Sequence, residues 1–209
     1  MATLSPHPSP RGERTREEIL DAAERLIADN GYAATSMSQL IRDSGAPSSS
    51  IYWHFSSKAG VLAAVMERAA TRFLNVMAQS RAAPDISDPK ERLRIFLASA
   101  RHAVTEDPNF LRLYHQFLLG TYGEFASATE TTRVRTEGIL SIKANLTDAY
   151  AAWGAVDAER VAAGLTPLFV TVFDGMFTAQ QAGDVDQVRM DLVVGALHAV
   201  AVELRAGAN

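Results

Sequence analysis

The fold of this 209-residue chain is decided by residues 15–65, which read TREEILDAAERLIADNGYAATSMSQLIRDSGAPSSSIYWHFSSKAGVLAAV. In the first part of this stretch, apolar residues recur at the spacing of one helix face. They are Ile19, Ala22, Ala23, Leu26 and Ile27. Thr15 and Glu18 fit a capping box at the start of the helix, and Asn30-Gly31 marks its end. The stretch therefore opens with an amphipathic helix.

Two further short helices are expected after the first. Ser36 and Gln39 fit a second capping box, and Gly45 stands where a left-handed residue ends that helix. Pro47 suits the start of a third helix, because a first-turn proline loses no hydrogen bond. Ser56-Ser57 then caps a long helix that follows. The sequence predicts three helices in about 40 residues, a compact domain of its own.

The remainder of the chain is predicted to be a helical bundle. From Lys58 onward, long stretches with helical apolar spacing follow one another without strand-like alternation. Proline, glycine and polar residues dominate the first 12 positions, which is typical of a flexible arm. We expect an all-α protein with a flexible arm at 1–12, a three-helix domain at 13–60 and a six-helix bundle at 61–209.

Composition and charge exclude several classes of site. The chain has no cysteine, so disulfides, thiolate metal sites and cysteine nucleophiles are excluded. It also lacks the metal-binding, dinucleotide and P-loop motifs, so neither a metal nor a cofactor is expected. The N-terminus has no apolar signal-peptide core, and no stretch of about 18 uninterrupted apolar residues occurs. We expect a cytoplasmic protein without a membrane span.

The net charge of −4 is unusual for a protein that grips nucleic acid, but its distribution is uneven. No acidic side chain occurs between Ser44 and Lys58, whereas the first helix carries several. Three short helices with a glycine turn form a helix-turn-helix, whose second helix enters the major groove. The acid-free window coincides with that second helix and therefore predicts a surface for DNA.

Specific DNA contacts are predicted from the helix-turn-helix geometry. The serines Ser48, Ser49 and Ser50 open the helix that faces the groove, where short hydroxyl side chains approach the duplex closely. Hydroxyl, indole and imidazole groups that can meet phosphate follow in Tyr52, Trp53 and His54. Lys58, Thr35 and Ser36 lie at helix starts, where free backbone N–H groups favour a phosphate.

Two of these assignments have a plain structural alternative. Trp53 could pack in the core instead of meeting DNA, as aromatic residues commonly do. The serines Ser48 to Ser50 could be a solvated helix cap, because serine is common at helix starts whether or not DNA is near. Ile51 and Phe55 are expected to pack inward in either case.

At residues 15–65 the chain resembles the TetR family of transcriptional regulators. A helix ending in NGY, a Thr-Ser cap, a glycine turn, an I-Y-x-H-F run and S-K-x-x-L occur in order. The resemblance implies an all-helical homodimer with an N-terminal DNA-binding domain and a C-terminal domain that binds an effector. It carries DNA contacts onto the nine residues named above, from Thr35 to Lys58.

The chain departs from the family pattern at three neighbouring positions. Pro47 stands where the family often has a serine cap, Ser48 where a basic residue is frequent, and Ser49 where glycine is usual. Because each phosphate contact contributes roughly 0.9 to the slope of log affinity against log salt, we expect a gentle salt dependence.

An apolar effector pocket is expected between helices of the bundle, the usual place for ligands in helical folds. The predicted lining residues are Phe73, Phe96, Tyr114, Phe117, Phe173 and Phe177. Polar candidates are His102, His115 and Asp174. Core packing is the alternative for each aromatic residue, because all of them lie at helical spacing.

The last two predicted helices, about 157–182 and 184–206, carry more apolar side chains than a small bundle can bury. Pairing them across a two-fold axis would give a homodimer whose two recognition helices lie about 34–36 Å apart on palindromic operator DNA. We expect a repressor that a small apolar molecule releases from DNA, and not an enzyme. The alternative is a helical-bundle binding protein or enzyme with a non-functional helix-turn-helix.

Overall fold

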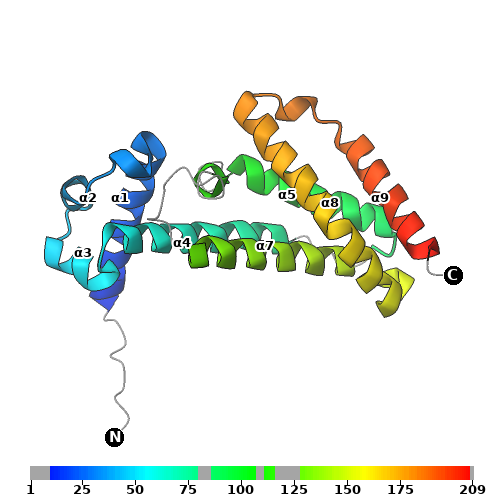
Figure 1. The fold of residues 1–209 in the computed structure, drawn as a ribbon, viewed down its shortest axis with the longest axis horizontal. Coiled ribbons are helices and arrows are strands. Elements are labelled where there is room, and N and C mark those ends of the chain that lie inside the picture. Colours follow the sequence, from blue (N-terminus) through cyan, green and yellow to red (C-terminus); the bar gives the residue numbers. More distant parts are fainter. Residues whose placement is uncertain (1–9, 80–85, 107–110, 116–127, 208–209) are drawn as a thin grey trace, which may run out of the picture. The chain divides into compact units, whose positions relative to one another are not determined.

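A computed structural model describes residues 10–79, 86–106, 111–115 and 128–207 of the chain. The helices are α1 (Pro10–Ala34), α2 (Met37–Ser44), α3 (Ser48–Phe55), α4 (Lys58–Ala78), α5 (Pro89–Glu106), α7 (Ala128–Ala149), α8 (Ala155–Ala182) and α9 (Met190–Ala206), as Figure 1 shows. No strand occurs in these ranges. The predicted all-α class is confirmed.

The described chain divides into two compact units. The first, called the N-terminal unit below, contains α1 to α3, α4 as far as Ala69, and the segment that begins at Leu113. The second, called the bundle, contains α4 from Ala70, α5, most of α7, and α8 and α9. The division falls inside α4, beyond residue 60, because the first turns of α4 pack into the core of the N-terminal unit.

Helix α1 begins earlier than the sequence pattern indicated. It starts at Pro10, a residue that a first helical turn tolerates, and Arg14 pairs with Glu18 one turn later at 3.0 Å. The predicted cap at Thr15 is therefore wrong, since Thr15 lies inside the helix. The predicted end is confirmed, because Gly31 breaks the helix with a φ of 76°.

The turn between α2 and α3 is built as the sequence predicted. The Ser36 hydroxyl accepts from the Gln39 backbone N–H at 3.1 Å, and the Gln39 side chain accepts from the Ser36 N–H at 2.7 Å. Gly45 ends α2 with a φ of 66°, which only glycine adopts readily. Pro47 precedes the first turn of α3. Local chemistry alone fixes where α3 begins.

The connection from α3 to α4 depends on a glycine. The Ser57 hydroxyl accepts from the Gly60 N–H at 3.1 Å and so caps α4. A Cβ at Gly60 would lie 1.9 Å from the carbonyl oxygen of Phe55, far inside van der Waals contact. Position 60 therefore excludes any side chain while α3 and α4 keep this arrangement.

The bundle is held by α5, α8 and α9, which pack against one another. The Phe96 and Phe169 rings stack with centroids 4.5 Å apart, and both side chains are buried. Gly164 lets α9 approach α8, because a Cβ there would lie 2.7 Å from Leu204 Cδ1. The Leu204 side chain of α9 therefore packs directly onto the backbone of α8 within one chain at this position.

Among the residues that the structure describes, α8 is long and apolar enough to cross a membrane by length and composition. Those of its apolar side chains that are buried have a packing reason instead, because they fill the bundle core. The buried ones are Val161, Leu165, Phe169, Phe173, Met176 and Phe177.

Two bundle helices are flanked by 3₁₀ turns. Helix α7 ends at Ala149 and is followed by a 3₁₀ turn over Ala151–Trp153, before Gly154. Helix α9 begins at Met190 and not near Asp184, because another 3₁₀ turn, Val185–Gln187, occupies the predicted first turn. In that turn the Gln187 side chain donates to the Asp184 carboxylate at 2.8 Å.

Candidate DNA-binding site

Helix α3 has one buried and one solvent-facing side. Ile51 and Phe55 are buried in the core of the N-terminal unit, as predicted. Ser48 and Ser49 are exposed in the first turn, and Ser50 is half-buried beside them. The serines are therefore placed where a ligand can reach them, while the apolar side fixes the helix.

The aromatic residues of α3 are exposed rather than packed. Tyr52 keeps 51% of its surface accessible and Trp53 keeps 69%. The Trp53 ring meets the His54 ring edge-on, with centroids 4.5 Å apart. Core packing of Trp53 is thus excluded for this structure, and a large aromatic surface lies open next to the exposed serines.

His54 is half-buried at the end of α3. Burial lowers the pKa of its imidazole below the ordinary 6.5, and the nearby Arg16 charge lowers it further. Arg16 also lies over the Phe55 ring, 5.6 Å from its centroid. His54 is accordingly neutral at pH 7, so α3 carries no side-chain charge under those conditions.

Lys58 connects the start of α4 with the end of α1. Its Nζ lies 4.3 Å from the centroid of the Tyr32 ring and donates to the Ala33 carbonyl oxygen at 3.4 Å. Burial lowers the pKa of the Lys58 ammonium. Lys58 therefore stabilises the junction of two helices whatever it contributes to a phosphate contact.

Thr35 and Ser36, which were predicted together as phosphate contacts, occupy different surroundings. Thr35 is buried, and its hydroxyl donates to the carbonyl oxygens of Gly31 at 2.9 Å and Leu26 at 3.2 Å. Ser36 is exposed at the start of α2. Thr35 thus closes the end of α1, and Ser36 is the better placed of the two for DNA.

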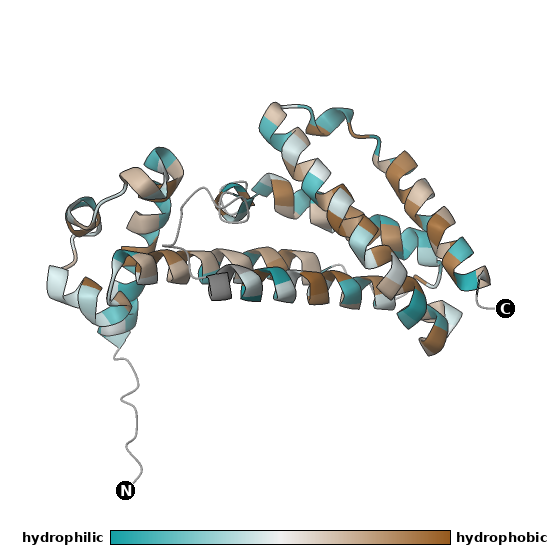
Figure 2. Cartoon of the chain, in the orientation of Figure 1, coloured by the Kyte–Doolittle hydropathy of each residue, from teal (hydrophilic) through white to brown (hydrophobic). Residues whose placement is uncertain are grey.

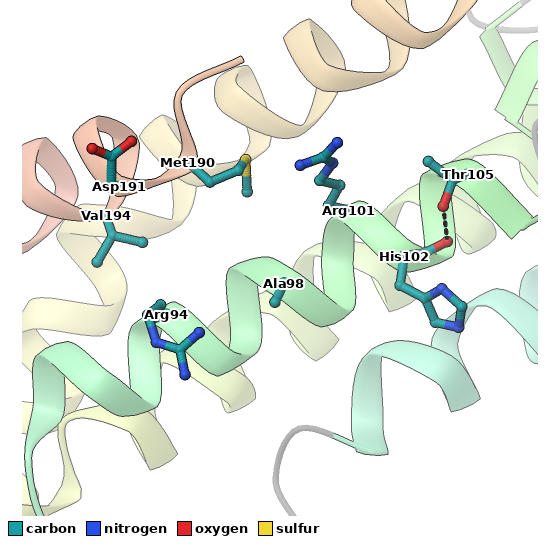
Figure 3. Close-up of a pocket in the computed structure, with 8 residues that line it drawn as sticks. All are labelled: Arg94, Ala98, Arg101, His102, Thr105, Met190, Asp191 and Val194. Carbon is teal, nitrogen blue, oxygen red and sulfur yellow. Dashed lines mark hydrogen bonds between the residues drawn. The ribbon is translucent and has the colours of Figure 1, made fainter. Parts of the chain in front are cut away.

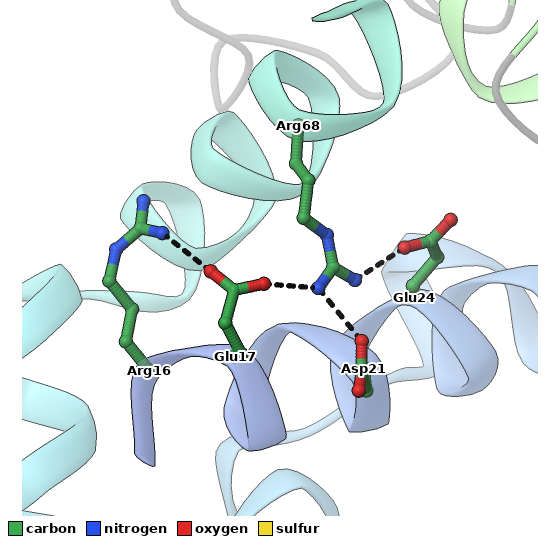
Figure 4. A network of polar contacts seen from close by, with 5 residues as sticks. All are labelled: Arg16, Glu17, Asp21, Glu24 and Arg68. Atoms are coloured by element: carbon green, nitrogen blue, oxygen red, sulfur yellow. Dashed lines mark hydrogen bonds and ion pairs between the residues drawn. The ribbon is translucent and has the colours of Figure 1, made fainter. Parts of the chain in front are cut away.

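A charged cluster, called the Arg68 network below, joins α1 to α4 (Figure 4). The guanidinium of Arg68 donates to the carboxylates of Glu17 at 2.9 Å, Asp21 at 2.8 Å and Glu24 at 2.5 Å. These acids lie on one face of α1, and Arg16 donates to Glu17 from the same helix. The side chain of Arg68 is only 17% exposed. Helix α4 is thereby tied to α1 by a partly buried ionic contact.

The residues predicted to line an effector pocket fall into three groups. Phe73, Phe96, Phe173 and Phe177 are buried in the bundle, where the Phe73 and Phe173 rings meet with centroids 5.4 Å apart. Tyr114 belongs to the N-terminal unit and packs against its hydrophobic core. Phe117 lies outside the described residues. The effector role of these side chains stays a prediction.

A cavity of about 550 Å³ lies between α5 and α9 (Figure 3). It is lined by Arg94, Ala98, Arg101, His102, Thr105, Met190, Asp191 and Val194. Arg94 pairs with Glu91 at 2.6 Å, and Arg101 pairs with Asp186 at 2.6 Å. Two arginines thus lie at the wall of the cavity, and each is paired with a nearby carboxylate. Of these lining residues, His102 was among the polar side chains predicted for a pocket. Helical spacing gives no signal for the others, because the cavity depends on where α9 begins and how α9 crosses α5.

The comparisons with known proteins agree with this geometry. Residues 19–65 match the family model described as bacterial regulatory proteins, tetR family. The chain is 35% identical over 156 residues to the HTH-type transcriptional regulator LmrA of Bacillus subtilis, covering 70% of this chain and 71% of LmrA. The chain belongs to the TetR family. It is a DNA-binding transcriptional regulator and not an enzyme.

Other TetR-family members extend the comparison over more of the chain. The HTH-type transcriptional activator FasR of Mycolicibacterium smegmatis is 27% identical over 161 residues, covering 77% of this chain and 71% of FasR. A solved SmeT–triclosan complex matches with a TM-score of 0.61 and 23% identity, covering 91% of each chain. The SmeT match supports a TetR-like fold for the chain as a whole.

Proposed function

We propose that this regulator is a homodimeric repressor that binds a palindromic operator through α3 and is released by a small, largely apolar effector. The observation that carries the proposal is the solvent-facing side of α3, which combines exposed serines and aromatics with a complete absence of acidic side chains. A surface of this kind can approach phosphate without charge repulsion. Binding of nucleoid DNA also implies a cytoplasmic protein.

The proposed contacts divide into two kinds. Ser48, Ser49 and Ser50 open α3 and face base edges in the major groove, as the first turn of a recognition helix does. Ser36 and Lys58 stand at the starts of α2 and α4, where backbone N–H groups and the helix dipole favour a phosphate. Tyr52, Trp53 and His54 complete the surface in the second turn. Thr35 is left out because its hydroxyl is engaged inside the protein.

A dimer interface is proposed on α8 and α9. Of the apolar residues expected there, several fill the bundle core, but Leu168, Leu192 and Val200 are exposed, with Leu192 at 62%. Figure 2 shows α9 coloured largely as hydrophobic. Gly175 is also exposed, and a Cβ there would meet nothing within 4 Å. An open apolar surface on two neighbouring helices suits a two-fold four-helix interface.

The dimer is tested by placing a charge in this surface. Leu192→Lys is expected to give a monomer by light scattering at micromolar concentration and to abolish binding to operator DNA, because both half-sites must be occupied together. Leu140→Lys is the matched control, since Leu140 is 59% exposed on α7. A Leu192→Lys variant that remains a dimer would contradict the proposed interface.

The effector is proposed to enter the aromatic part of the bundle. Phe73, Phe173 and Phe177 lie in the described core, and side chains of this kind favour an apolar or aromatic molecule. The solved SmeT structure is a complex with triclosan, so triclosan is one compound to include in a screen. A thermal-shift screen of apolar aromatic compounds tests the proposal, since a ligand raises the melting temperature of the state that it binds. A true effector must also release DNA.

The direction of regulation needs its own experiment, because FasR is named an activator. A reporter fused to the regulated promoter should be expressed more strongly when the gene is deleted. Lower expression in the deletion strain would make this chain an activator. A gel shift with the upstream region of its own gene tests DNA binding itself. Absence of any complex at low salt would favour a helical-bundle binding protein with an inactive helix-turn-helix.

A further inference from the structure

Helix α3 lacks the side chains that usually read bases by paired hydrogen bonds. Its eight residues, Ser48–Phe55, include no arginine, lysine, asparagine, glutamine, aspartate or glutamate. Arginine and lysine read guanine, asparagine and glutamine read adenine, and acidic residues accept from cytosine. In its first turn, hydrogen-bonded readout by α3 therefore falls to serine hydroxyls, which discriminate weakly because they donate and accept, and in its second turn to the single polar groups of Tyr52, Trp53 and His54.

The neighbouring helix does not replace them. Gln39 uses its side-chain oxygen to accept from the Ser36 N–H at 2.7 Å in the capping box. Arg42, at the other end of α2, pairs with Asp43 at 3.3 Å. The Gln39 oxygen is thus engaged in the cap of α2, and Arg42 lies in an exposed pair at the far end of that helix. The specificity of α3 itself therefore rests on another kind of contact.

The second turn of α3 offers that contact. Trp53 follows Ser49 by four residues, so both lie on the same face of the helix. Trp53 is 69% exposed and Tyr52 is 51% exposed, although aromatic rings of this size are normally covered. The edge-on contact with His54 limits the positions that the indole can take. An apolar surface is thereby presented next to the hydroxyls of the first turn.

The apolar group that the major groove offers is the C5-methyl group of thymine. We infer that Trp53, together with Tyr52, contacts thymine methyl groups and so makes the operator half-site specific for A·T pairs beneath the second turn of α3. This inference rests on the proposed binding of operator DNA by α3. Beyond that function, it names the thymine methyl group as the feature that α3 recognises and Trp53 as the main residue that recognises it.

The test removes the methyl groups without changing the base pairs. An operator is first selected from random duplexes with the full-length protein, and its half-site thymines are then replaced by deoxyuridine. Affinity is expected to fall about fourfold for each contacted thymine, the equivalent of about 0.8 kcal/mol for one buried methyl-sized group. Deoxyuridine placed outside the half-sites is the matched control and should leave affinity unchanged.

A Trp53→Ala variant connects the effect to one side chain. Because Trp53 is exposed, the variant should keep the melting temperature of the wild type. It should bind the thymine operator more weakly and should no longer distinguish thymine from deoxyuridine at the position that Trp53 contacts. If the variant still distinguishes thymine from deoxyuridine as strongly as the wild type does, Trp53 does not contact the methyl group.

The outcomes separate the inference from the function on which it rests. Wild-type protein that binds the selected operator equally well with thymine and deoxyuridine overturns the methyl contact but leaves operator binding intact. Failure to select any duplex overturns the proposed operator binding itself. A selected half-site without A·T pairs beneath the second turn of α3 also overturns the inference.

Discussion

The N-terminal unit and the bundle are stabilised in different ways. In the N-terminal unit, single positions fix the path of the chain: Gly45 ends α2, Gly60 admits α4 beside α3, and Arg68 holds three carboxylates. In the bundle, many buried apolar side chains on long helices share the same task. A helix-turn-helix therefore depends on exact local geometry, whereas a bundle core accepts substitutions between apolar residues as long as the total side-chain volume is kept.

The largest effect is expected from Gly60→Ala. The added Cβ would lie 1.9 Å from the Phe55 carbonyl oxygen, so the backbone must shift, and we expect a loss of more than about 4 kcal/mol in unfolding free energy. Gly138→Ala in the bundle is the matched control, because a Cβ there meets nothing within 4 Å. It should stabilise α7 by up to about 1 kcal/mol. Similar losses for both variants in thermal unfolding would show that the two units tolerate an added methyl group equally.

A smaller effect is expected when the Arg68 network is opened. Arg68→Met leaves three carboxylates facing one another, and we expect a loss of about 2 kcal/mol, less than for a fully buried pair because Glu17 and Asp21 are over half exposed. Arg92→Met is the control in the bundle, since Arg92 is equally covered but pairs with Asp148 and donates to the Ile86 carbonyl oxygen. Urea unfolding measures both. A larger loss for Arg92→Met would contradict the prediction.

Tyr32 and Tyr150, which are buried, provide a test by pH. Burial raises the pKa of Tyr150 far above 10, and burial also raises the pKa of Tyr32. Because the unfolded chain ionises first, stability is fully present below pH 10 and declines as pH rises above it. Tyr150→Phe should reduce this decline more than Tyr32→Phe, at a cost of about 1 kcal/mol near neutral pH. Unfolding curves between pH 8 and about 11 decide the matter.

The smallest effect concerns two histidines whose pKa values are lowered mainly by burial. As pH falls below about 6.5, His54 gains a positive charge on α3. Operator affinity should then rise, and the slope of log affinity against log salt should steepen by up to the equivalent of one phosphate contact per protomer. His198 lies in α9 of the bundle, so His198→Gln should retain the effect. His54→Gln should lose it in titrations at pH 5.5 and 7. Persistence of the effect in His54→Gln would exclude His54 as its source.

The sequence could predict what depends on residues close together in the chain. The Ser36–Gln39 capping box and the Gly45 turn are set within a few residues, and both are present. The predicted cap at Thr15 was wrong because the helix extends back to Pro10, and the ion pair between Arg14 and Glu18 supports this extension. A good capping pattern does not end a helix whose preceding residues are also favourable.

Features that depend on packing could not be predicted. Thr35 has the residue type of a phosphate contact, but its hydroxyl turns inward to the end of α1. Tyr114 has the spacing of a bundle residue, but it packs with the N-terminal unit. Helical periodicity shows that a face is buried without showing against which partner. The cavity beside α9 has the same cause, because Met190 and Arg94 line it together only through the crossing of α5 and α9.

The glycine between α3 and α4 has a mechanical consequence. Because a Cβ at Gly60 would lie 1.9 Å from the Phe55 carbonyl oxygen, the backbones of α3 and α4 are in close contact at this point, and a tilt of α3 toward α4 would make them collide. A displacement of the first turns of α4 toward α3 must then move α3 as well, so this contact transmits motion between the two helices.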